Sequence, residues 1–223
     1  MCRARIKPDV IGYNAAISAC KEGEKWEEAL SLFRQMPGAG INPNAVSYNA
    51  TISACGEGGK WEEALLLLKE MRRTRTKPDV VSYNAAISAC EKGEKWEEAL
   101  SLFRQMPGAG IKPDVVSYNA TILACGKGGK REEALSLLKE MYRASIKPNL
   151  VSYNAAISAC EKGGKWKEVL SLLEAMRSAG VKPNVISYNA TISACEKGQE
   201  MEGSAIVAQG DAPHRHQAWR CQL

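Results

Sequence analysis

Apolar and polar positions alternate along this chain in a pattern that repeats every 35 residues. Within residues 45–79, Tyr48, Ile52 and Cys55 follow one another at i, i+4 and i+7, which places them on one face of an α-helix. Ser47 comes directly before Tyr48, and its hydroxyl suits the N-cap position of a helix. The pattern therefore predicts a first helix that begins at Tyr48, with Ser47 as its N-cap.

A second helix is predicted after Gly58, because glycine readily takes the positive φ that ends many helices. The second helix covers residues 60–71 and carries glutamates in its first turn, where the helix dipole favours acids. Pro78 then requires extended backbone before it and closes the unit. The positions expected to be buried in the second helix are Trp61, Ala64, Leu65, Leu68 and Met71.

This unit of two helices occurs several times in tandem. Six copies of a segment close to Ser-Tyr-Asn-Ala-Ala-Ile-Ser-Ala-Cys keep the same step, the first entered from Gly12. A fixed period of this size predicts an all-α fold, an α-solenoid in which helix-turn-helix repeats stack into a right-handed superhelix. The full repeats are expected at residues 10–44, 45–79, 80–114, 115–149 and 150–184. We expect residues 1–9 to be the end of a preceding repeat, 185–198 the first helix of a sixth, and 199–223 an irregular or disordered tail.

Composition excludes several classes of protein. A net charge of +5 over 223 residues is compatible with a nucleic-acid partner without requiring one. The apolar runs are too short to span a membrane, and the N-terminal segment is too short for a targeting peptide. No Cys-x-x-Cys pair occurs, and His214 and His216 lack ligand partners at suitable spacing, so neither a metal nor a cofactor is expected. The cysteines that recur once per repeat are expected to be reduced core residues: Cys20, Cys55, Cys90, Cys125, Cys160 and Cys195.

Three motifs together resemble the pentatricopeptide repeat family in its plain 35-residue form. Ser-Tyr-Asn opens the first helix, Trp-Glu-Glu-Ala-Leu lies in the second, and Ile-Lys-Pro-Asp or a close variant ends the loop, over about residues 6–198. The resemblance implies binding of single-stranded RNA in mitochondria or chloroplasts, with one base read by each repeat. In this family the readers are the first-helix Asn and the last residue of the repeat. The implied base-contacting pairs are Asn14 with Asn44, Asn49 with Asp79, Asn84 with Asp114, Asn119 with Asn149, and Asn154 with Asn184, while Asn189 has no clear partner.

The closing residue is Asp in some repeats and Asn in others. By the family resemblance, this difference implies different base preferences. Asn with Asp resembles a reader of uridine, and Asn with Asn a reader of pyrimidines that favours cytidine. With the N-terminus towards the RNA 5′ end, the implied target is 5′-Y-U-U-Y-Y-3′. An amide both donates and accepts, whereas an ionised Asp only accepts, which gives the difference a chemical basis. Two alternatives stay open: helix-start hydrogen bonding for the Asn row, and an ordinary loop residue for the Asp or Asn.

The same resemblance assigns roles to two further sets of residues. The residues expected to flank the bases are Ile11, Val46, Val81, Val116, Val151 and Ile186. Core packing is the alternative for these stiff β-branched side chains. The residues expected to contact phosphates are Lys92, Lys127, Lys162 and Lys197, unless they are simply solvated charges. The first two repeats have Glu22 and Glu57 at the position of these lysines. The Trp that opens the second helix is expected in the core and not stacked on a base, and in the fourth repeat Arg131 replaces it.

Three classes of function remain to be compared. A sequence-selective RNA-binding module is favoured, acting in organellar RNA processing, stability or translation together with protein partners. The alternative is a protein-binding scaffold of the tetratricopeptide kind, although the period of 35 and the absence of Trp-x-x-Leu-Gly-x-x-Tyr argue against it. A deaminase would require His-x-Glu and Pro-Cys-x-x-Cys, which do not occur, so no enzymatic activity is expected.

Overall fold

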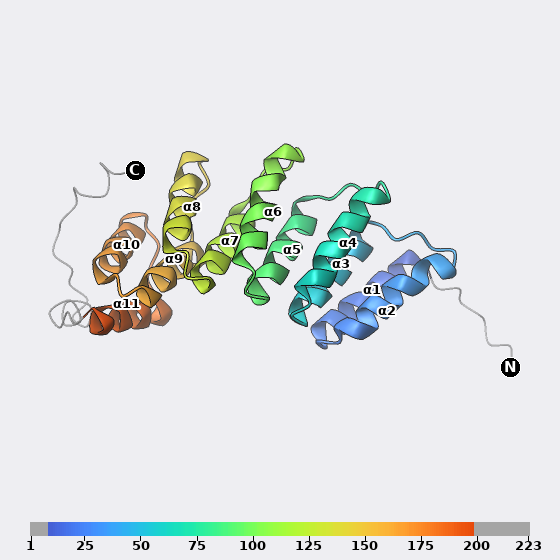
Figure 1. The fold of residues 1–223 in the computed structure, drawn as a ribbon, viewed down its shortest axis with the longest axis horizontal. Helices are drawn as coiled ribbons and strands as arrows, with labels where there is room; N and C mark the ends of the chain where they lie inside the picture. The colour runs from blue at the N-terminus through green and yellow to red at the C-terminus, as the bar shows by residue number, and fades with distance from the viewer. Residues whose placement is uncertain (1–8, 199–223) are drawn as a thin grey trace. The chain divides into compact units, whose positions relative to one another are not determined.

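The computed structural model describes residues 9–198, and the chain divides into two compact units, Met1–Pro113 (unit 1) and Asp114–Leu223 (unit 2). The described residues form eleven α-helices and no strand (Figure 1). Unit 1 contains α1 (Val10–Glu22), α2 (Trp26–Gly38), α3 (Ala45–Glu57), α4 (Trp61–Arg73), α5 (Val80–Lys92) and α6 (Trp96–Gly108). Unit 2 contains α7 (Val115–Lys127), α8 (Arg131–Arg143), α9 (Leu150–Lys162), α10 (Trp166–Ser178) and α11 (Val185–Lys197). The predicted tail and the end of a preceding repeat fall outside the described residues, except for Asp9.

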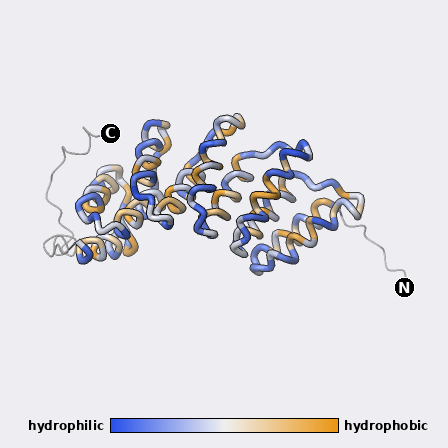
Figure 2. The backbone as a smooth tube through the Cα atoms, in the orientation of Figure 1, coloured by the Kyte–Doolittle hydropathy of each residue, from blue (hydrophilic) through white to orange (hydrophobic). Residues whose placement is uncertain are grey.

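The odd-numbered helices form a continuous layer within each unit. In unit 1, α3 packs between α1 and α5, and in unit 2, α9 packs between α7 and α11. Each even-numbered helix packs on the odd-numbered helix before it and, within the same unit, on the one after it. Figure 2 shows that every helix carries both hydrophobic and hydrophilic positions, as expected for helices buried on one side only. The predicted all-α, α-solenoid fold class is confirmed.

The first helix of each repeat begins earlier than its apolar pattern predicted. In the second repeat the N-cap is Asn44, which accepts a hydrogen bond from the backbone N–H of Ser47 at 3.0 Å. The Ser47 hydroxyl accepts the N–H of Asn44 at 3.2 Å in return, which completes a capping box. Ser47 is therefore the third residue of α3 and not its N-cap. The prediction was wrong because the closing residue of one repeat caps the first helix of the next.

The buried stripe of α4 differs from the predicted one. In α4, Ala64, Leu68 and Met71 are buried as expected. Leu67 is also buried, whereas Leu65 is only partly so. An even-numbered helix contacts two odd-numbered helices at once, so α4 must cover both α3 and α5 with apolar side chains. A single helix period cannot reveal this second contact.

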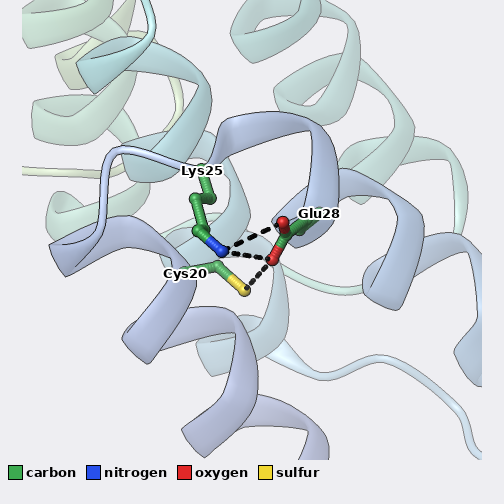
Figure 3. Close-up of polar contacts among 3 residues, drawn as sticks. All are labelled: Cys20, Lys25 and Glu28. Carbon is green, nitrogen blue, oxygen red and sulfur yellow. Dashed lines mark hydrogen bonds and ion pairs between the residues drawn. The ribbon is translucent and has the colours of Figure 1, made fainter.

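The recurring cysteines are free thiols, as predicted, and all but the first are buried. Burial raises the pKa of Cys55 to about 11 and the pKa of Cys90 to about 12. Cys20, at the end of α1, is partly exposed and lies 4.0 Å (Sγ to Oε2) from Glu28 of α2 (Figure 3). Lys25, in the turn between these helices, forms an ion pair with Glu28 at 3.2 Å.

A glycine follows each first helix, but not for the reason that the sequence suggested. Gly58 and Gly93 both have φ of −77°, and the positive φ falls on the next residue in each case. A Cβ atom at Gly93 would lie 2.5 Å from Cδ1 of Trp61, in the second helix of the preceding repeat. The glycine is therefore required by close packing of the indole, and Trp61 is half-buried at this junction instead of lying in the core.

Candidate nucleic-acid interface

The two residues predicted to read each base are brought together by the stacking of adjacent repeats. Asn14 lies in α1, and Asn44 caps α3, which packs against α1. The side-chain amide of Asn14 donates from Nδ2 to Oδ1 of Asn44 at 3.4 Å. The equivalent hydrogen bonds run from Asn49 to Asp79 at 3.3 Å, from Asn119 to Asn149 at 3.2 Å and from Asn154 to Asn184 at 3.3 Å. Residues 30 positions apart thus form a side-chain pair at the start of a helix.

The remaining predicted readers occupy the same helix positions in other repeats. Asn84 lies in α5 of unit 1 and Asp114 caps α7 of unit 2, so each belongs to a different unit. Asn189, for which no clear partner was predicted, is exposed on α11. In each unit the first-helix Asn residues recur at one position on stacked helices, and none of them is fully buried. Their role in base reading stays a prediction.

A serine that sequence reasoning treated as a cap also contacts the reader. The hydroxyl of Ser47 donates to Oδ1 of Asn14 at 2.6 Å, while its distance to Oδ1 of Asn44 is 3.1 Å. Ser152 and Ser187 make the same 2.6 Å bond to Asn119 and Asn154. The sequence shows a Ser two residues before the Asn in most repeats. That this Ser forms a hydrogen bond with the Asn of the preceding repeat can be seen only in the stacked structure.

The Asn49–Asp79 pair, one of the two predicted pairs that contain an Asp, departs from this arrangement. The hydroxyl of Ser82 donates to Oδ1 of Asp79 at 2.9 Å. Oδ1 of Asn49 is then left buried with no hydrogen-bond partner among the described residues. An unpaired buried acceptor costs about 1–3 kcal/mol. The Asn49–Asp79 pair is therefore less well satisfied than the three Asn–Asn pairs.

Asp79 is held as a carboxylate. Partial burial acts to raise its pKa, but hydrogen bonds from the backbone and hydroxyl of Ser82, the amide of Asn49 and the backbone of Val81 outweigh this and leave the pKa below its usual value. The bonds from Ser82 and Asn49 converge on Oδ1. None of these three bonds uses Oδ2.

The residues expected to flank the bases are exposed at the starts of the first helices. Ile11, Val46, Val81, Val116, Val151 and Ile186 have between 52% and 72% of their surface accessible. Each lies three residues before the Asn of its helix. Large apolar side chains with this exposure are not part of the core, so the core-packing alternative is wrong. Their role against bases stays a prediction.

The lysines expected to contact phosphates differ in their surroundings. Lys92 forms an ion pair with Glu57 of the preceding repeat, and Lys197 does the same with Glu161. Partial burial acts to raise the pKa of Glu161, but Lys197, Ser193 and nearby Lys162 lower it overall. Lys162 is exposed and forms no ion pair with the described residues, since the preceding repeat offers Gly126 and Lys127 at the matching positions. Lys127 is exposed at the end of α7.

Other kinds of site find no support in the described part of the chain. Residues 9–198 contain no group of three or more His, Cys, Asp or Glu side chains arranged to hold a metal ion. No helix there combines the length and apolar character needed to cross a membrane.

Models of known families match almost the whole described chain. The PPR repeat family model matches residues 8–57, 43–92 and 78–127, the PPR repeat model matches 116–146, and the pentatricopeptide repeat domain model matches 136–197. These matches favour the pentatricopeptide over the tetratricopeptide interpretation. No match was found among curated protein sequences.

Solved structures of similar proteins agree with this result. The pentatricopeptide repeat protein PPR10 in complex with an 18-nt psaJ RNA element is 28% identical over 95% of this chain, with a TM-score of 0.69. A further crystal structure, of PPR10 from maize, is 27% identical over 91% of this chain, with a TM-score of 0.55. The chain spans about a third of the length of PPR10, 30% and 34% in the two structures.

A more distant structure shares the fold. The PPR domain of Arabidopsis thaliana protein-only RNase P 1, in complex with tRNA, is 20% identical over 71% of this chain and 84% of its own length, with a TM-score of 0.63. At this identity the likeness concerns the fold alone. From the tandem matches between residues 8 and 197, we conclude that the chain belongs to the pentatricopeptide repeat family.

Proposed function

We propose that this protein binds single-stranded RNA with sequence selectivity and that each repeat reads one base. The observation that carries the proposal is the side-chain pair at each helix start, such as Asn119 with Asn149, beside an exposed β-branched residue such as Val116. An amide offers hydrogen bonds to a base edge, and a stiff apolar side chain offers a surface for a base face. The likeness to PPR10, solved in complex with an RNA element, supports the same use of the fold.

The hydrogen bonds already made inside each pair determine what is left for the base. In the Asn119–Asn149 pair both Oδ1 atoms already accept hydrogen bonds, so the groups without any bond are N–H donors. In the Asn49–Asp79 pair the amide keeps an N–H donor and the carboxylate keeps Oδ2 as an acceptor. Cytosine presents adjacent acceptors at N3 and O2, whereas uracil presents an N3–H donor between two acceptors. We infer that Asn–Asn pairs prefer cytidine and Asn–Asp pairs prefer uridine.

Taken in chain order, these preferences give a target of the form 5′-Y-U-U-Y-Y-3′, with cytidine favoured at each Y. One net hydrogen bond is worth about 0.5–1.5 kcal/mol, which corresponds to roughly two- to tenfold discrimination at each base. The protein is thus proposed to select pyrimidine-rich RNA by the sum of several modest preferences.

We further propose that the protein acts by binding and not by catalysis. The side chains at the helix starts are amides, hydroxyls and a carboxylate with a lowered pKa, which are suited to recognition and poorly suited to proton transfer at neutral pH. Any effect on RNA processing, stability or translation would then be indirect, through occupancy of the RNA or recruitment of protein partners. Action in a mitochondrion or chloroplast is part of the same proposal and rests on family resemblance.

A binding titration tests the proposal. A fluorescent oligoribonucleotide that contains CUUCC and one that contains its purine counterpart are titrated with the protein at several salt concentrations. We expect tighter binding of the pyrimidine RNA at every salt concentration, while both affinities fall as salt rises because phosphate contacts release counterions. Equal affinities for the two RNAs at matched salt would refute base reading. The double variant Asn119→Ala with Asn154→Ala, checked for folding by circular dichroism, should lose the preference for a pyrimidine over a purine at the two corresponding RNA positions.

A further inference from the structure

We propose that Ser152, together with Ser47 and Ser187, is a positioning residue that fixes the orientation of the base-reading amide in the preceding repeat. The inference rests on the proposed function and adds a residue to the machinery of selectivity. It also holds that Asp79 takes the hydroxyl of Ser82 and leaves the amide of Asn49 held at its nitrogen only.

The geometry of the Asn–Asn pairs supports the first part of the proposal, that the serine orients the amide of the preceding repeat. A serine hydroxyl has one hydrogen, and Ser152 lies 2.6 Å from Oδ1 of Asn119 but 3.1 Å from Oδ1 of Asn149. The shorter contact is the bond that the hydroxyl makes. Asn119 in turn donates from Nδ2 to Oδ1 of Asn149 at 3.2 Å. Both ends of the amide are therefore held, and a flip by half a turn would break both bonds.

The serine is itself held firmly enough to do this. Ser152 is completely buried, and its oxygen accepts the backbone N–H of Asn149 at 3.0 Å. Its own backbone N–H donates to Oδ1 of Asn149 at 3.1 Å. The hydroxyl hydrogen therefore has a fixed direction, towards the reader on the preceding helix. The remaining N–H of Asn119 is the group of this amide that a base can engage.

The second repeat shows what an Asp changes. A carboxylate is a stronger acceptor than an amide, and the hydroxyl of Ser82 donates to Oδ1 of Asp79 at 2.9 Å. Oδ1 of Asn49 has less than 1 Å² of accessible surface and no partner among the described residues. The amide of Asn49 is thus fixed at its nitrogen only. The same serine position therefore supports the amide of Asn119 through Ser152 but does not support the amide of Asn49 through Ser82.

The chain also shows that a helix start of this kind forms without the hydroxyl. Gly12 occupies the serine position of the first repeat, and α1 still begins at Val10, with the backbone N–H of Gly12 donating to Asp9 at 2.8 Å. Removal of the serine hydroxyl is therefore compatible with folding, which makes substitution a usable test.

Ser152→Ala and Ser82→Ala form a matched pair of variants. Both lose an oxygen that accepts the N-cap backbone N–H, at 3.0 Å and 3.1 Å respectively. Ser82→Ala also loses the hydroxyl bond to Asp79, which keeps its bonds from the Ser82 backbone N–H and the Asn49 amide. Only Ser152→Ala also releases a reading amide. In titrations with RNAs that differ at one base, Ser152→Ala should reduce the preference for C over U at the position of Asn119 by about two- to tenfold. Ser82→Ala should leave the preference at the position of Asn49 within about twofold of wild type. A purely structural role would weaken all the RNAs equally and leave these ratios unchanged.

A second measurement needs no RNA and separates this inference from the proposed function. Nuclear magnetic resonance of the free protein reports the side-chain NH₂ signals of Asn119 and Asn49. Ser152→Ala should shift the Asn119 signals and speed their hydrogen exchange, while Ser82→Ala should leave those of Asn49 nearly unchanged. The same response in both variants, or none in either, would overturn the positioning role. If the free-protein signals respond as expected but the wild type does not discriminate between bases, the positioning stands and base reading fails.

Discussion

Gly93→Ala is expected to destabilise unit 1 because of the indole that packs against this position. The added Cβ would lie 2.5 Å from Cδ1 and 2.9 Å from Cγ of Trp61, closer than carbon atoms can approach without movement. Overpacking of this kind costs about 1–3 kcal/mol. The backbone at Gly93 has φ of −77°, which alanine adopts without strain, so reduced entropy of the unfolded chain offsets about 0.4–1 kcal/mol. We expect a net loss of about 1–2 kcal/mol.

Gly163→Ala is the matched control within the same chain. Gly163 ends the equivalent helix in unit 2, but the Trp of the preceding repeat is replaced there by Arg131. The nearest atom to an added Cβ is Nη1 of that arginine at 3.2 Å, at the end of a flexible side chain that can move away. Only the entropic term then remains, so Gly163→Ala should be neutral or stabilising by about 0.4–1 kcal/mol.

Urea unfolding followed by far-UV circular dichroism measures the difference. With an m-value of about 1–3 kcal/mol/M, Gly93→Ala should lower the midpoint by roughly 0.5–1 M, and Gly163→Ala should not lower it. The double variant Trp61→Arg with Gly93→Ala recreates the junction found at Gly163 and should recover at least about 1 kcal/mol relative to the sum of the single effects. Equal effects of the two alanine variants, or strict additivity in the double variant, would refute the packing explanation.

Three further outcomes follow from the structure. Asp79→Asn removes the free acceptor beside Asn49, so preference at that base should move from U towards C in single-base titrations; an unchanged ratio would reject the assignment while leaving the fold intact. Burial raises the pKa of Cys90 to about 12, so peptide mapping after alkylation at mildly alkaline pH should find Cys20 labelled well before Cys90, and the reverse order would contradict the burial described. Lys162→Gln should reduce the slope of log affinity against log salt by about 0.7, and an unaltered slope would mean that this lysine does not contact phosphate.

Much of the fold could be predicted from the sequence because it depends on local patterns. The spacing of Tyr48, Ile52 and Cys55 marks a buried helical face, and those three side chains are indeed buried. The repeat length and its apolar stripes are enough to predict an α-solenoid, because each pair of helices needs a stacked neighbour to cover its apolar face. The recurrence of the Asn in each copy also marked a position that lies three residues after an exposed β-branched residue at every first-helix start.

The errors share a cause, which is that they concern contacts between repeats. Ser47 was interpreted as an N-cap because a serine before an apolar run often is one, but Asn44 has that role and Ser47 binds Asn14 of the preceding repeat. Gly58 was expected to have a positive φ. Instead, its lack of a side chain makes room for Trp26, because a Cβ at Gly58 would lie 2.3 Å from Cδ1 of that indole.

The sequence by itself determined that each unit holds two helices, which faces of them are mainly apolar and how often the unit repeats, because these follow from spacings along the chain. Only the tertiary structure decided that a closing residue would meet the Asn located 30 positions earlier, and that a serine hydroxyl would bind that same Asn. Hydrogen bonds and close packing between neighbouring repeats depend on how the helices stack. Local helix propensity does not encode the distance between side chains of two stacked repeats.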